Sequence, residues 1–399
     1  MTMKTIYDEK NLKGKTIFLR ADLNSSLIEG RVVLSPRIRE HAKTIYFLSE
    51  EGAKTVVLSH QGRPGDHNFV SMDRHASLIK KLIGKDVKFF RWEDNYVEEI
   101  KKLNDGEVIL LENVRMQPEE LEKKTPEEHA KDRYIKGLAP LGDMYVQDAL
   151  SVCHRSQASV TGFAAYMPCF VGPCLKKDLD ALAKLKEIKD HKLLVLGGAK
   201  VEDSIPLLKT MLDQKMASQA CVGGMFGELF LIAKGVKLGK KEAFFEEKGL
   251  LELIPEIKDI LSTHGDKITL PIDLAVLNGN NRRKEVKVGE LPSEFDTFDI
   301  GWDTIEMFKD RIKESELTIF NGPMGMYEDS KFRLGTKKIL ECIAFNRTFS
   351  ILGGGDTEKA LKMIGLEPSD FDHVSLAGKA LLQYLSGKKL PGLEVLESG

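Results

Sequence analysis

Basic side chains follow short apolar runs in the first part of this chain, at positions where they could bind an anion. Arg20, His60, Arg63, Arg115 and Arg155 each stand at or shortly after the end of such a run. The runs are residues 16–19, 55–58, 108–111 and 144–146. In a parallel α/β sheet the carboxyl ends of all strands open on one crevice, where ligands bind. Cations delivered there by four strands predict a pocket for a small, multiply charged anion.

Glycines take the place of these cations in the second half of the chain. They stand at 197–198, 223–224, 322 and 353–355, directly or one residue after the apolar runs 193–196, 221–222, 318–320 and 349–352. Glycine after a strand lets a ligand lie against bare backbone, and the next helix attracts phosphate through its free N–H groups and its dipole. This half is therefore predicted to bind a nucleotide. A small-anion site paired with a nucleotide site indicates phosphoryl transfer.

The elements that must position these residues are strands alternating with amphipathic helices. Residues 37–50 and 75–82 carry apolar side chains at three- and four-residue steps, as a helix with one buried face does. Residues 175–190 indicate one long helix, and the highly charged segment 119–136 is predicted to be a solvated loop and helix. The alternation of strands and helices with Gly-rich turns predicts parallel βαβ units and the α/β class.

Composition limits the partners and the compartment. The chain has 399 residues, which favours two domains, and its net charge of -2 gives no basic field to recruit nucleic acid. No apolar run approaches the roughly 20 residues that span a bilayer, and residues 1–10 carry charges where a signal peptide has its apolar core. Five scattered cysteines without a CxxC pair favour free thiols, with a Cys169–Cys174 bond as the less favoured alternative. We therefore expect a cytoplasmic enzyme with no membrane, nucleic-acid or obligatory protein partner.

Six motifs occur in order along the chain. They are residues 20–24 (RADLN), 60–64 (HQGRP), 111–115 (LENVR), 197–201 (GGAKV), 321–325 (NGPMG) and 353–357 (GGGDT). In this order and at this spacing they closely resemble the phosphoglycerate kinase family across nearly the whole chain. Residues 198–204 and 385–392 are most similar to its archaeal branch. The resemblance implies a glycolytic and gluconeogenic kinase that reversibly moves a phosphoryl group from 1,3-bisphosphoglycerate to ADP, giving 3-phosphoglycerate and ATP.

The resemblance also implies a domain plan of two doubly wound, Rossmann-like parallel-sheet domains that face a cleft. Residues 1–170 would form the 3-phosphoglycerate-binding domain, 171–190 a hinge helix, and 191–375 the nucleotide-binding domain. Residues 376–399 would pack back on the first domain. We expect this enzyme to work by in-line transfer, with charge neutralisation by Arg, Lys and Mg²⁺ and with domain closure.

The resemblance implies a role for each residue of this chain that matches a motif of the family. Arg37 and Lys200 would be catalytic, and Arg37 would meet the transferred phosphoryl group. On the substrate side the carried-over residues are Asp22, Leu23, Asn24, Arg37, His60, Gln61, Gly62, Arg63, Arg115 and Arg155. On the nucleotide side they are Gly198, Ala199, Lys200, Gly223, Gly224, Asn321, Glu328, Gly354, Gly355, Asp356 and Thr357. Mg²⁺ would be the cofactor with ATP or ADP, and Asp356 its protein ligand.

The chain departs from the family pattern at two cations. Ser204 stands where most members carry a lysine, one helical turn after Lys200, and this loss removes a positive charge from the expected phosphoryl path. Residues 375–380 have lost two glycines and gained Lys379. We hypothesise that Lys379 partly restores the missing charge; the alternative is that it faces solvent.

Four alternatives stay open on the residues alone. A nicotinamide dehydrogenase lacks its GxGxxG turn here, and a P-loop enzyme lacks GxxxxGK[ST]. A hydrolase built on the adjacent Cys153 and His154 is disfavoured because neighbouring residues rarely face each other. A catalytically silent relative used as a binding module is the main non-enzyme alternative. The residues that argue against this last alternative are Arg37, Lys200, Glu328 and Asp356.

Overall fold

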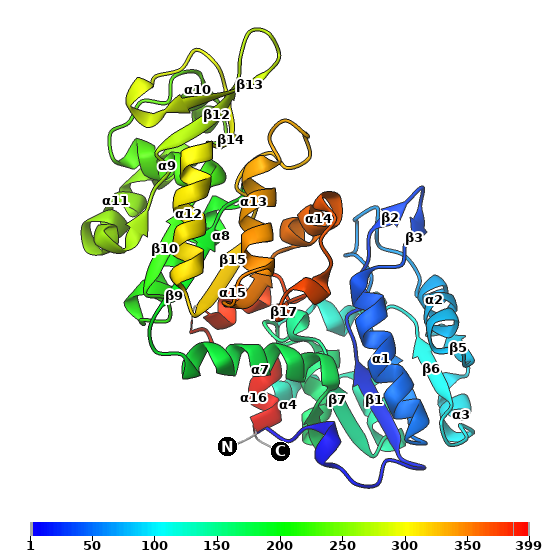
Figure 1. Cartoon of the computed structure of the whole chain (residues 1–399). Coiled ribbons are helices and arrows are strands. Elements are labelled where there is room, and N and C mark those ends of the chain that lie inside the picture. The colour runs from blue at the N-terminus through cyan, green and yellow to red at the C-terminus, as the bar shows by residue number, and fades with distance from the viewer. Residues whose placement is uncertain (1–2, 386, 398–399) are drawn as a thin grey trace. The chain divides into compact units, whose positions relative to one another are not determined.

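The computed structural model describes residues 3–385 and 387–397, and the chain divides into two compact units (Figure 1). Unit 1 comprises Met1–Leu179 and Lys389–Gly399, and unit 2 comprises Asp180–Lys388. Within the described residues, no helix is long and apolar enough to cross a membrane. Each unit is built on a sheet of parallel strands, which confirms the predicted α/β class.

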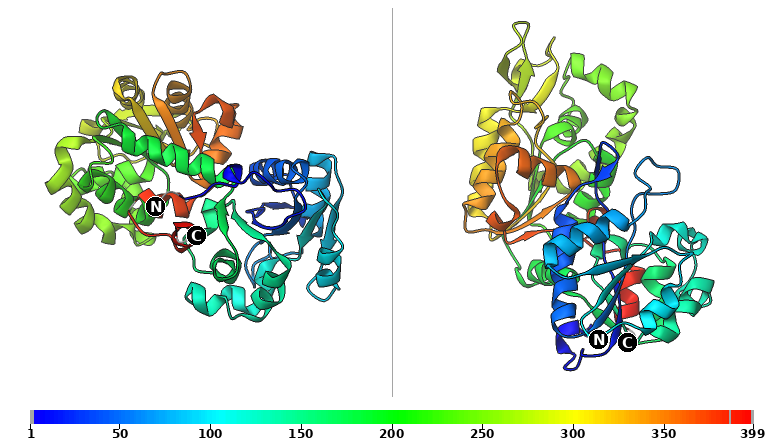
Figure 2. Two further views of the ribbon diagram at one scale, coloured as in Figure 1. Left: turned by 90° about the horizontal axis from the view of Figure 1, so that it is seen from below. Right: turned by 90° about the vertical axis from the view of Figure 1, so that its right-hand side faces the viewer.

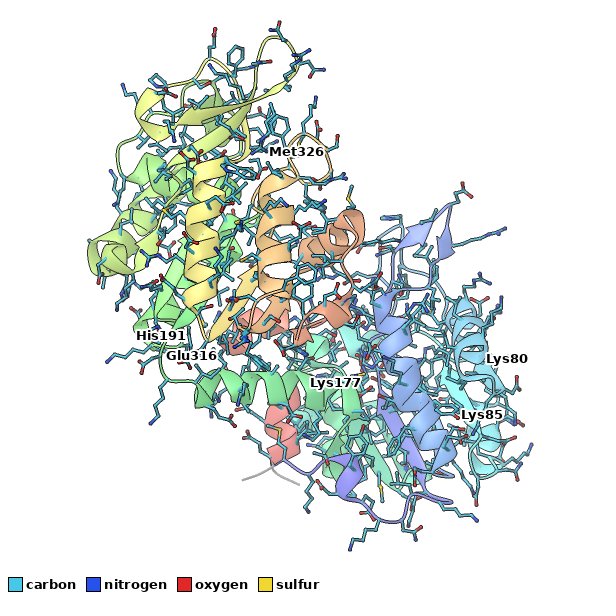
Figure 3. All side chains as sticks on the ribbon, viewed as in Figure 1. Lys80, Lys85, Lys177, His191, Glu316 and Met326 are labelled. Carbon is cyan, nitrogen blue, oxygen red and sulfur yellow. The ribbon has the colours of Figure 1, made fainter. Side chains whose placement is uncertain are left out.

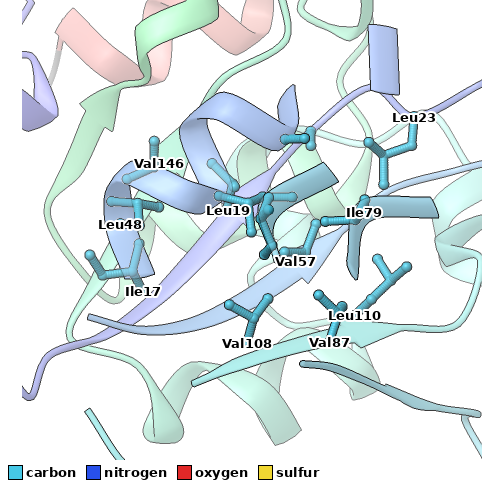
Figure 4. Packing of buried hydrophobic residues seen from close by; sticks show 14 of the residues in the cluster. Ile17, Leu19, Leu23, Leu48, Val57, Ile79, Val87, Val108, Leu110 and Val146 are labelled. Atoms are coloured by element: carbon cyan, nitrogen blue, oxygen red, sulfur yellow. The ribbon is translucent and has the colours of Figure 1, made fainter. Parts of the chain in front are cut away.

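Unit 1 contains a six-stranded sheet whose order is β5-β6-β4-β1-β7-β8. The strands are β1 (Thr16–Arg20), β4 (Lys54–Leu58), β5 (Val87–Phe90), β6 (Val108–Leu111), β7 (Met144–Gln147) and β8 (Cys169–Val171). All five pairings are parallel, and Leu19 stands between Val57 and Val146. These side chains are fully buried beneath Ile79 and Leu48 of the covering helices (Figure 4). A parallel strand covered on both faces needs apolar residues at nearly every position, which is why the strands appear as continuous apolar runs in the sequence.

Helices and a short ribbon complete unit 1. They are β2 (Leu27–Ile28), β3 (Arg31–Val32), α1 (Pro36–Glu50), α2 (Asp73–Ile83), α3 (Tyr96–Lys101), α4 (Pro126–His129), α5 (Arg133–Leu138), α6 (Ala158–Thr161) and α16 (Pro391–Glu397). The start of α1 is fixed by the Ser35 hydroxyl, which accepts from the Ile38 N–H, and by Pro36 in the first turn. Helix α16 contacts α6 and β8, so the end of the chain belongs to this unit (Figure 2).

The prediction that segment 119–136 is solvated is wrong at several positions, which include two polar side chains. Glu120 and His129 are fully buried. The Glu120 carboxylate accepts from the Tyr134 hydroxyl and from both the N–H and the hydroxyl of Ser159. His129 contacts Asp132 through Nδ1, 2.7 Å from Oδ2. Buried charges need such partners, and the partner of Glu120 lies 39 residues away in the sequence, so the charged composition of the segment could not reveal it.

Unit 2 contains a second six-stranded parallel sheet, in the order β11-β10-β9-β15-β16-β17. These strands are β9 (Lys192–Leu196), β10 (Gln219–Val222), β11 (Ile268–Thr269), β15 (Leu317–Asn321), β16 (Phe349–Gly353) and β17 (His373–Val374). A small antiparallel sheet contains β12 (Asp273–Leu277), β13 (Arg283–Lys287) and β14 (Thr297–Ile300). The helices are α8 (Val201–Asp213), α9 (Gly224–Ala233), α10 (Lys240–Glu247), α11 (Ile254–His264), α12 (Trp302–Glu314), α13 (Leu334–Ala344), α14 (Gly355–Ile364) and α15 (Lys379–Leu385).

The division between the units differs in detail from the expected boundaries. The long helix is α7 (Pro173–Glu187), and the division at residues 179 and 180 falls inside it. Residues 376–388 belong to unit 2, because α15 packs on α8, so the return to unit 1 begins at Lys389 rather than at residue 376. The side chain of Lys379 lies outside the described residues. All five cysteines are free thiols, Cys169 and Cys174 included.

Candidate functional site

In unit 1 the candidate site begins at Asp22, just after β1. Its Oδ2 accepts from the Ser151 hydroxyl (2.6 Å) and lies 3.2 Å from Nη1 of Arg37, and its Oδ1 accepts from the Asn24 N–H (3.0 Å). Burial alone would raise the pKa of Asp22, but the Arg37 guanidinium and the hydrogen bond from Ser151 hold it well below its ordinary value. The ionised carboxylate therefore fixes Arg37 at the start of α1, with about a quarter of the Arg37 side chain exposed.

His60 is a buried, neutral side chain beside this carboxylate. Burial, followed by the positive charges of Arg115, Arg20 and Arg37, lowers the pKa of His60 well below its ordinary value, although Asp22 acts in the opposite direction. Nη2 of Arg20 donates to His60 Nδ1 (3.3 Å). The proton of the neutral ring is therefore on Nε2, which makes His60 a hydrogen-bond donor at that atom.

Arg20 contacts other residues of the protein and not the ligand site. The sequence had predicted that Arg20 would face the ligand. Its side chain is completely buried. Its Nε donates to the Ser159 hydroxyl (2.8 Å), and its Nη1 donates to the backbone carbonyl of Ala21. The Ser159 hydroxyl in turn donates to the buried Glu120. Arg20 is thus a positioning residue that orients His60.

The Gly62 peptide joins two predicted ligand residues. Its N–H donates to Oδ1 of Asn24 (3.0 Å), and its carbonyl accepts from Nη1 of Arg115. Gly62 has a φ of +65°, and a Cβ there would lie 2.4 Å from the carbonyl oxygen of Asn68. Only glycine meets both requirements, so this residue sets the positions of Asn24 and Arg115 together.

Two other predicted substrate residues are used inside the protein. The Gln61 side chain accepts from the Ser25 N–H and donates to the carbonyls of Ser25 and Asn68. Leu23 is fully buried, and its N–H donates to the Ser59 hydroxyl. These contacts hold the loops after β1 and β4 together, so both residues shape the site through the backbone.

Three arginines form a positive cluster in the loops after β4, β6 and β7. Arg63 is exposed, Arg115 is buried and Arg155 is half-buried. Burial, followed by the like charges of Arg20 and Arg155, lowers the pKa of Arg115 to about 10, and burial together with Arg63 also lowers the pKa of Arg155. Among the described residues, none of the three forms an ion pair with a carboxylate. A dianionic group would relieve this mutual repulsion, and forked guanidinium donors match phosphate oxygens.

In the part of the chain that the structure describes, one group of potential metal ligands is found. One ligand atom each of His41, Asp148 and Cys174 lies within 4.8 Å of the other two. The carboxylate oxygens of Asp148 already have partners, because Oδ2 lies 2.7 Å from His41 Nδ1 and Oδ1 accepts from the Cys174 N–H (2.8 Å). The three groups therefore form a polar cluster of α1, the loop after β7 and the start of α7, in which both oxygens of Asp148 already have partners.

In unit 2 a cavity of about 500 Å³ opens at the carboxyl edge of the sheet. It is lined by Gly198, Ala199, Gly224, Met225, Glu228, Lys241, Phe244, Asp296, Thr297, Phe298, Pro323, Gly325, Met326, Tyr327, Glu328 and Asp356. Met326 marks this edge, and His191 and Glu316 mark the opposite, amino edge of the same sheet (Figure 3). The cavity is therefore where a parallel sheet presents its ligand site.

The glycines after these strands let three loops pack backbone against backbone. Gly322 has a φ of +89°, and a Cβ on it would lie 2.4 Å from the carbonyl oxygen of Gly197; a Cβ on Gly224 would lie 2.9 Å from that of Pro323. Gly224 lines the cavity. A Cβ on Gly223 would instead lie 2.7 Å from Sδ of the buried Met324, so Gly223 serves core packing.

The N-terminus of α14 carries the charged part of the unit 2 site. Gly354 caps this helix with a φ of +95°, and the Thr357 hydroxyl accepts from the Gly322 N–H (3.1 Å). A Cβ on Gly354 would lie 2.7 Å from Oδ1 of Asn321. The free N–H groups of the first turn are thereby held at the end of β15, the geometry that attracts phosphate.

Asp356 lies in the first turn of α14 and contacts two lysines. Its Oδ1 accepts from Lys359 (3.1 Å) and its Oδ2 from Lys200 (3.3 Å). Burial raises the pKa of Asp356, but these two ammonium groups outweigh burial and lower it. The Lys200 side chain is 71% exposed. Ser204 is buried, and its hydroxyl donates to the Lys200 carbonyl (3.2 Å), so it points back along α8 instead of toward a ligand.

Sequence reasoning missed two charged residues of this cavity, Glu228 and Lys241. Both are buried, at 3% and 7% exposure. Glu228 carried a visible signal, because it is the one charged residue in the otherwise apolar segment 224–233. A buried charge inside an apolar helix needs a partner or a function.

The similarities of this chain to known proteins fall in one family. A family model described as phosphoglycerate kinase matches residues 7–388. The chain is 39% identical to the phosphoglycerate kinase of Sulfolobus acidocaldarius, over 99% of this chain and 96% of that protein. It is 36% identical to that of Methanopyrus kandleri, over 98% and 96%. The crystal structure of phosphoglycerate kinase from Pyrococcus horikoshii OT3 superimposes with a TM-score of 0.91 at 34% identity, covering 99% of this chain and 98% of that one.

Proposed function

The chain belongs to the phosphoglycerate kinase family, and we propose that unit 1 binds the phosphoglycerate while unit 2 binds the nucleotide. It is a glycolytic kinase that transfers a phosphoryl group with ADP and ATP. The observation that carries this division is the contrast of charge. Three arginines that form no ion pair with a carboxylate of the described residues cluster in unit 1, whereas unit 2 has a mainly apolar cavity beside a helix N-terminus.

For 3-phosphoglycerate, we propose that the arginine cluster binds the phosphate. Arg63, Arg115 and Arg155 would hold it through forked N–H donors, with His60 donating from Nε2. The glycerate end would lie at Asn24, whose amide NH₂ can donate while its Oδ1 is occupied by Gly62. Asp22 would accept from the substrate hydroxyl.

For the nucleotide, we propose that the phosphates lie at the N-terminus of α14 and the ribose at Glu328. Gly198, Ala199, Gly355 and Thr357 would contact the phosphates through backbone or hydroxyl donors, and Gly224 would lie under the base. Members of the family use ATP or ADP with a divalent cation. We place Mg²⁺ at Asp356, because this carboxylate is ionised and lies at the edge of the cavity; Mg²⁺ typically takes one carboxylate together with phosphate oxygens and water. The ion would neutralise charge on the phosphates.

The proposed chemistry needs no general base. In the direction of ATP use, the attacking group is the carboxylate of 3-phosphoglycerate, which is already ionised at neutral pH. Its oxygen forms a bond to the γ-phosphorus, the bond from that phosphorus to the bridging oxygen breaks, and ADP leaves with the electron pair. Charge on the group in transit would be stabilised by Arg37 from one side and Lys200 from the other. Asp22 would keep Arg37 aimed.

Because the two sets of residues belong to different units, turnover requires them to meet. We propose that α7, which contains the division between the units, acts as the hinge. Small-angle scattering with both substrates bound should show a smaller radius of gyration than with either one alone. Unchanged dimensions in a complex that turns over would refute the hinge.

The activity is tested by 3-phosphoglycerate-dependent ATP consumption in a coupled assay. We expect consumption that needs both substrates and a divalent cation. Arg115→Ala should raise the KM for 3-phosphoglycerate at least about ten-fold and leave the KM for ATP unchanged. Arg74→Ala, an exposed arginine on α2, is the matched control. A chain that binds both ligands without turnover would be a silent binding module.

A further inference from the structure

Glu228 has no part in the function proposed above, yet it lines the nucleotide cavity. It lies on α9, and 3% of its surface is exposed. Within the described residues, its Oε2 has no hydrogen-bond partner. A buried carboxyl oxygen left without a donor destabilises the folded protein, so a ligand that supplies a donor there would be stabilised.

Lys241 is the ion-pair partner of this oxygen, but its ammonium group is held by other contacts. Its Nζ stays 3.9 Å from Oε2, donates to the Thr297 carbonyl (2.9 Å) and lies over the rings of Phe244 and Phe298 at 5.1 and 5.3 Å. Burial raises the pKa of Glu228, and Lys241 and then the Thr297 hydroxyl lower it only in part. The charge of Lys241 therefore partly offsets the cost of burying the Glu228 carboxyl group in the cavity wall. It leaves Oε2 able to accept a hydrogen bond.

The residues that line the unit 2 cavity indicate which part of a nucleotide would lie next to Glu228. Asp356 and Ala199 line the cavity where the N-terminus of α14 attracts phosphate. The wall around Glu228 instead includes Met225, Phe244 and Phe298, which present apolar and aromatic surface. Flat heteroaromatic rings bind such surface by stacking. The ring of the nucleotide would therefore lie at Glu228.

We propose that Glu228 reads the 6-position of the purine, with Oε2 accepting a hydrogen bond from the 6-amino group of adenine. This inference rests on the proposed nucleotide site in unit 2 and adds its base selectivity. Hypoxanthine and guanine carry a 6-oxo group, which would set two acceptors against each other with no proton between them. Burial makes such a mismatch costly. Glu228 thus selects adenine nucleotides over 6-oxopurine nucleotides.

The test compares ATP with inosine triphosphate, which replaces the 6-amino group by a 6-oxo group. In the wild-type enzyme we expect kcat/KM for ATP to exceed that for inosine triphosphate at least about ten-fold. Glu228→Gln keeps the shape and adds an amide NH₂ that can donate to a 6-oxo group. The preference should fall about ten-fold or more, and the KM for 3-phosphoglycerate should stay unchanged. Glu246→Gln, an exposed glutamate on α10, should keep the wild-type preference.

Equal preference in Glu228→Gln and wild type would overturn the proposal, as would a wild type that does not discriminate. Should Glu228→Gln fail to fold, calorimetry on the wild-type protein with ADP and inosine diphosphate gives the same answer. We expect about ten-fold tighter binding of ADP, and equal affinities would refute the role of Glu228. An enzyme that uses neither triphosphate would instead refute the proposed function.

Discussion

The candidate half-sites of unit 1 and unit 2 are formed by different kinds of contact. In unit 1 the ligand-facing groups are charged side chains held by buried polar partners: Asp22 holds Arg37, Arg20 holds His60, and the Gly62 peptide holds Arg115. In unit 2 loops pack backbone against backbone, and the charged groups at the edge, such as Lys200, are largely exposed. One half-site is therefore fixed by a polar network and the other by close contact of glycines.

Because the two half-sites are held in different ways, substitutions in unit 1 and in unit 2 should damage the protein differently. A substitution in the unit 1 network leaves a buried charge without its partner, so it should reduce stability as well as activity. A substitution at a unit 2 glycine introduces a Cβ where no space exists, so it should move a loop. The two tryptophans allow the units to be followed separately, because Trp92 belongs to unit 1 and Trp302 to unit 2. Trp302→Phe and Trp92→Phe backgrounds then each report one unit by fluorescence.

The largest expected effect is on the stability of unit 1, through His41. Burial alone would lower the pKa of His41, but Cys174 and Asp148 outweigh it and hold the pKa well above its ordinary value. His41→Ala leaves Asp148 buried without this partner and should destabilise unit 1 by about 3–5 kcal/mol. Urea unfolding followed by Trp92 measures this, with the exposed Lys43→Ala as the control. An equal loss reported by Trp302 would contradict the separation of the units.

The same pair predicts the direction of pH dependence. The folded-state pKa of His41 lies above its unfolded value of about 6.5, so its stabilisation is complete below that pH and is lost as the pH rises through the raised value. The urea midpoint of unit 1 should therefore fall as pH rises above about 6.5, and His41→Ala should flatten this dependence. A midpoint that rises with pH in the wild type, and not in the variant, would show that the sign is wrong.

The second prediction concerns catalysis by Arg37. Arg37→Ala removes the charge that would stabilise the phosphoryl group in transit, so kcat should fall by about 10²-fold or more while the KM for 3-phosphoglycerate changes little. Arg39→Ala, an exposed residue on the same helix, should behave as wild type. A rise in KM alone would mean that Arg37 only binds substrate.

Sequence patterns predicted the inner strands of the two parallel sheets and the loops that follow them, because both are local; the edge strands β5, β8, β11 and β17 and the antiparallel sheet were not predicted. Each buried parallel strand is a continuous apolar run, and each loop begins where that run ends, as at Leu58 and Leu111. The function of Arg20 was not predictable in this way. It ends β1 like a ligand residue, but its partner Ser159 lies 139 residues further along the chain. Whether a cation at a strand end faces the ligand or the core depends on that distant partner.

The glycines of unit 2 also show that the sequence alone does not tell which residues face the ligand. The pairs 197–198 and 223–224 look alike in the sequence, and both were predicted to face the nucleotide. In the structure Gly224 lines the cavity while Gly223 makes space for Met324, 101 residues later in the numbering. Only the assembled loops distinguish a glycine that faces a ligand from one that faces the core.

The third prediction breaks the packing of these loops. Gly322→Ala would place a Cβ 2.4 Å from the Gly197 carbonyl oxygen at a φ of +89°. We expect a loss of about 1–3 kcal/mol in unit 2 stability and at least about ten-fold weaker ADP binding, with 3-phosphoglycerate binding unchanged. Gly265→Ala, where a Cβ meets no atom within 4 Å, is the control. Calorimetry with each substrate separates the outcomes, and a loss confined to 3-phosphoglycerate would reverse the assignment of the units.

The smallest expected effect is at Ser204, one helical turn after Lys200. Because its hydroxyl donates to the carbonyl of Lys200, the N-cap of α8, its proton is already used inside the helix and is not presented to a phosphate. Ser204→Ala should therefore cost about 1 kcal/mol or less and change kcat by less than about two-fold. Steady-state kinetics with ATP and 3-phosphoglycerate checks this. A loss of ten-fold or more, with unit 2 stability unchanged, would place the Ser204 hydroxyl on the phosphoryl path and would show that unit 2 also depends on a buried polar side chain.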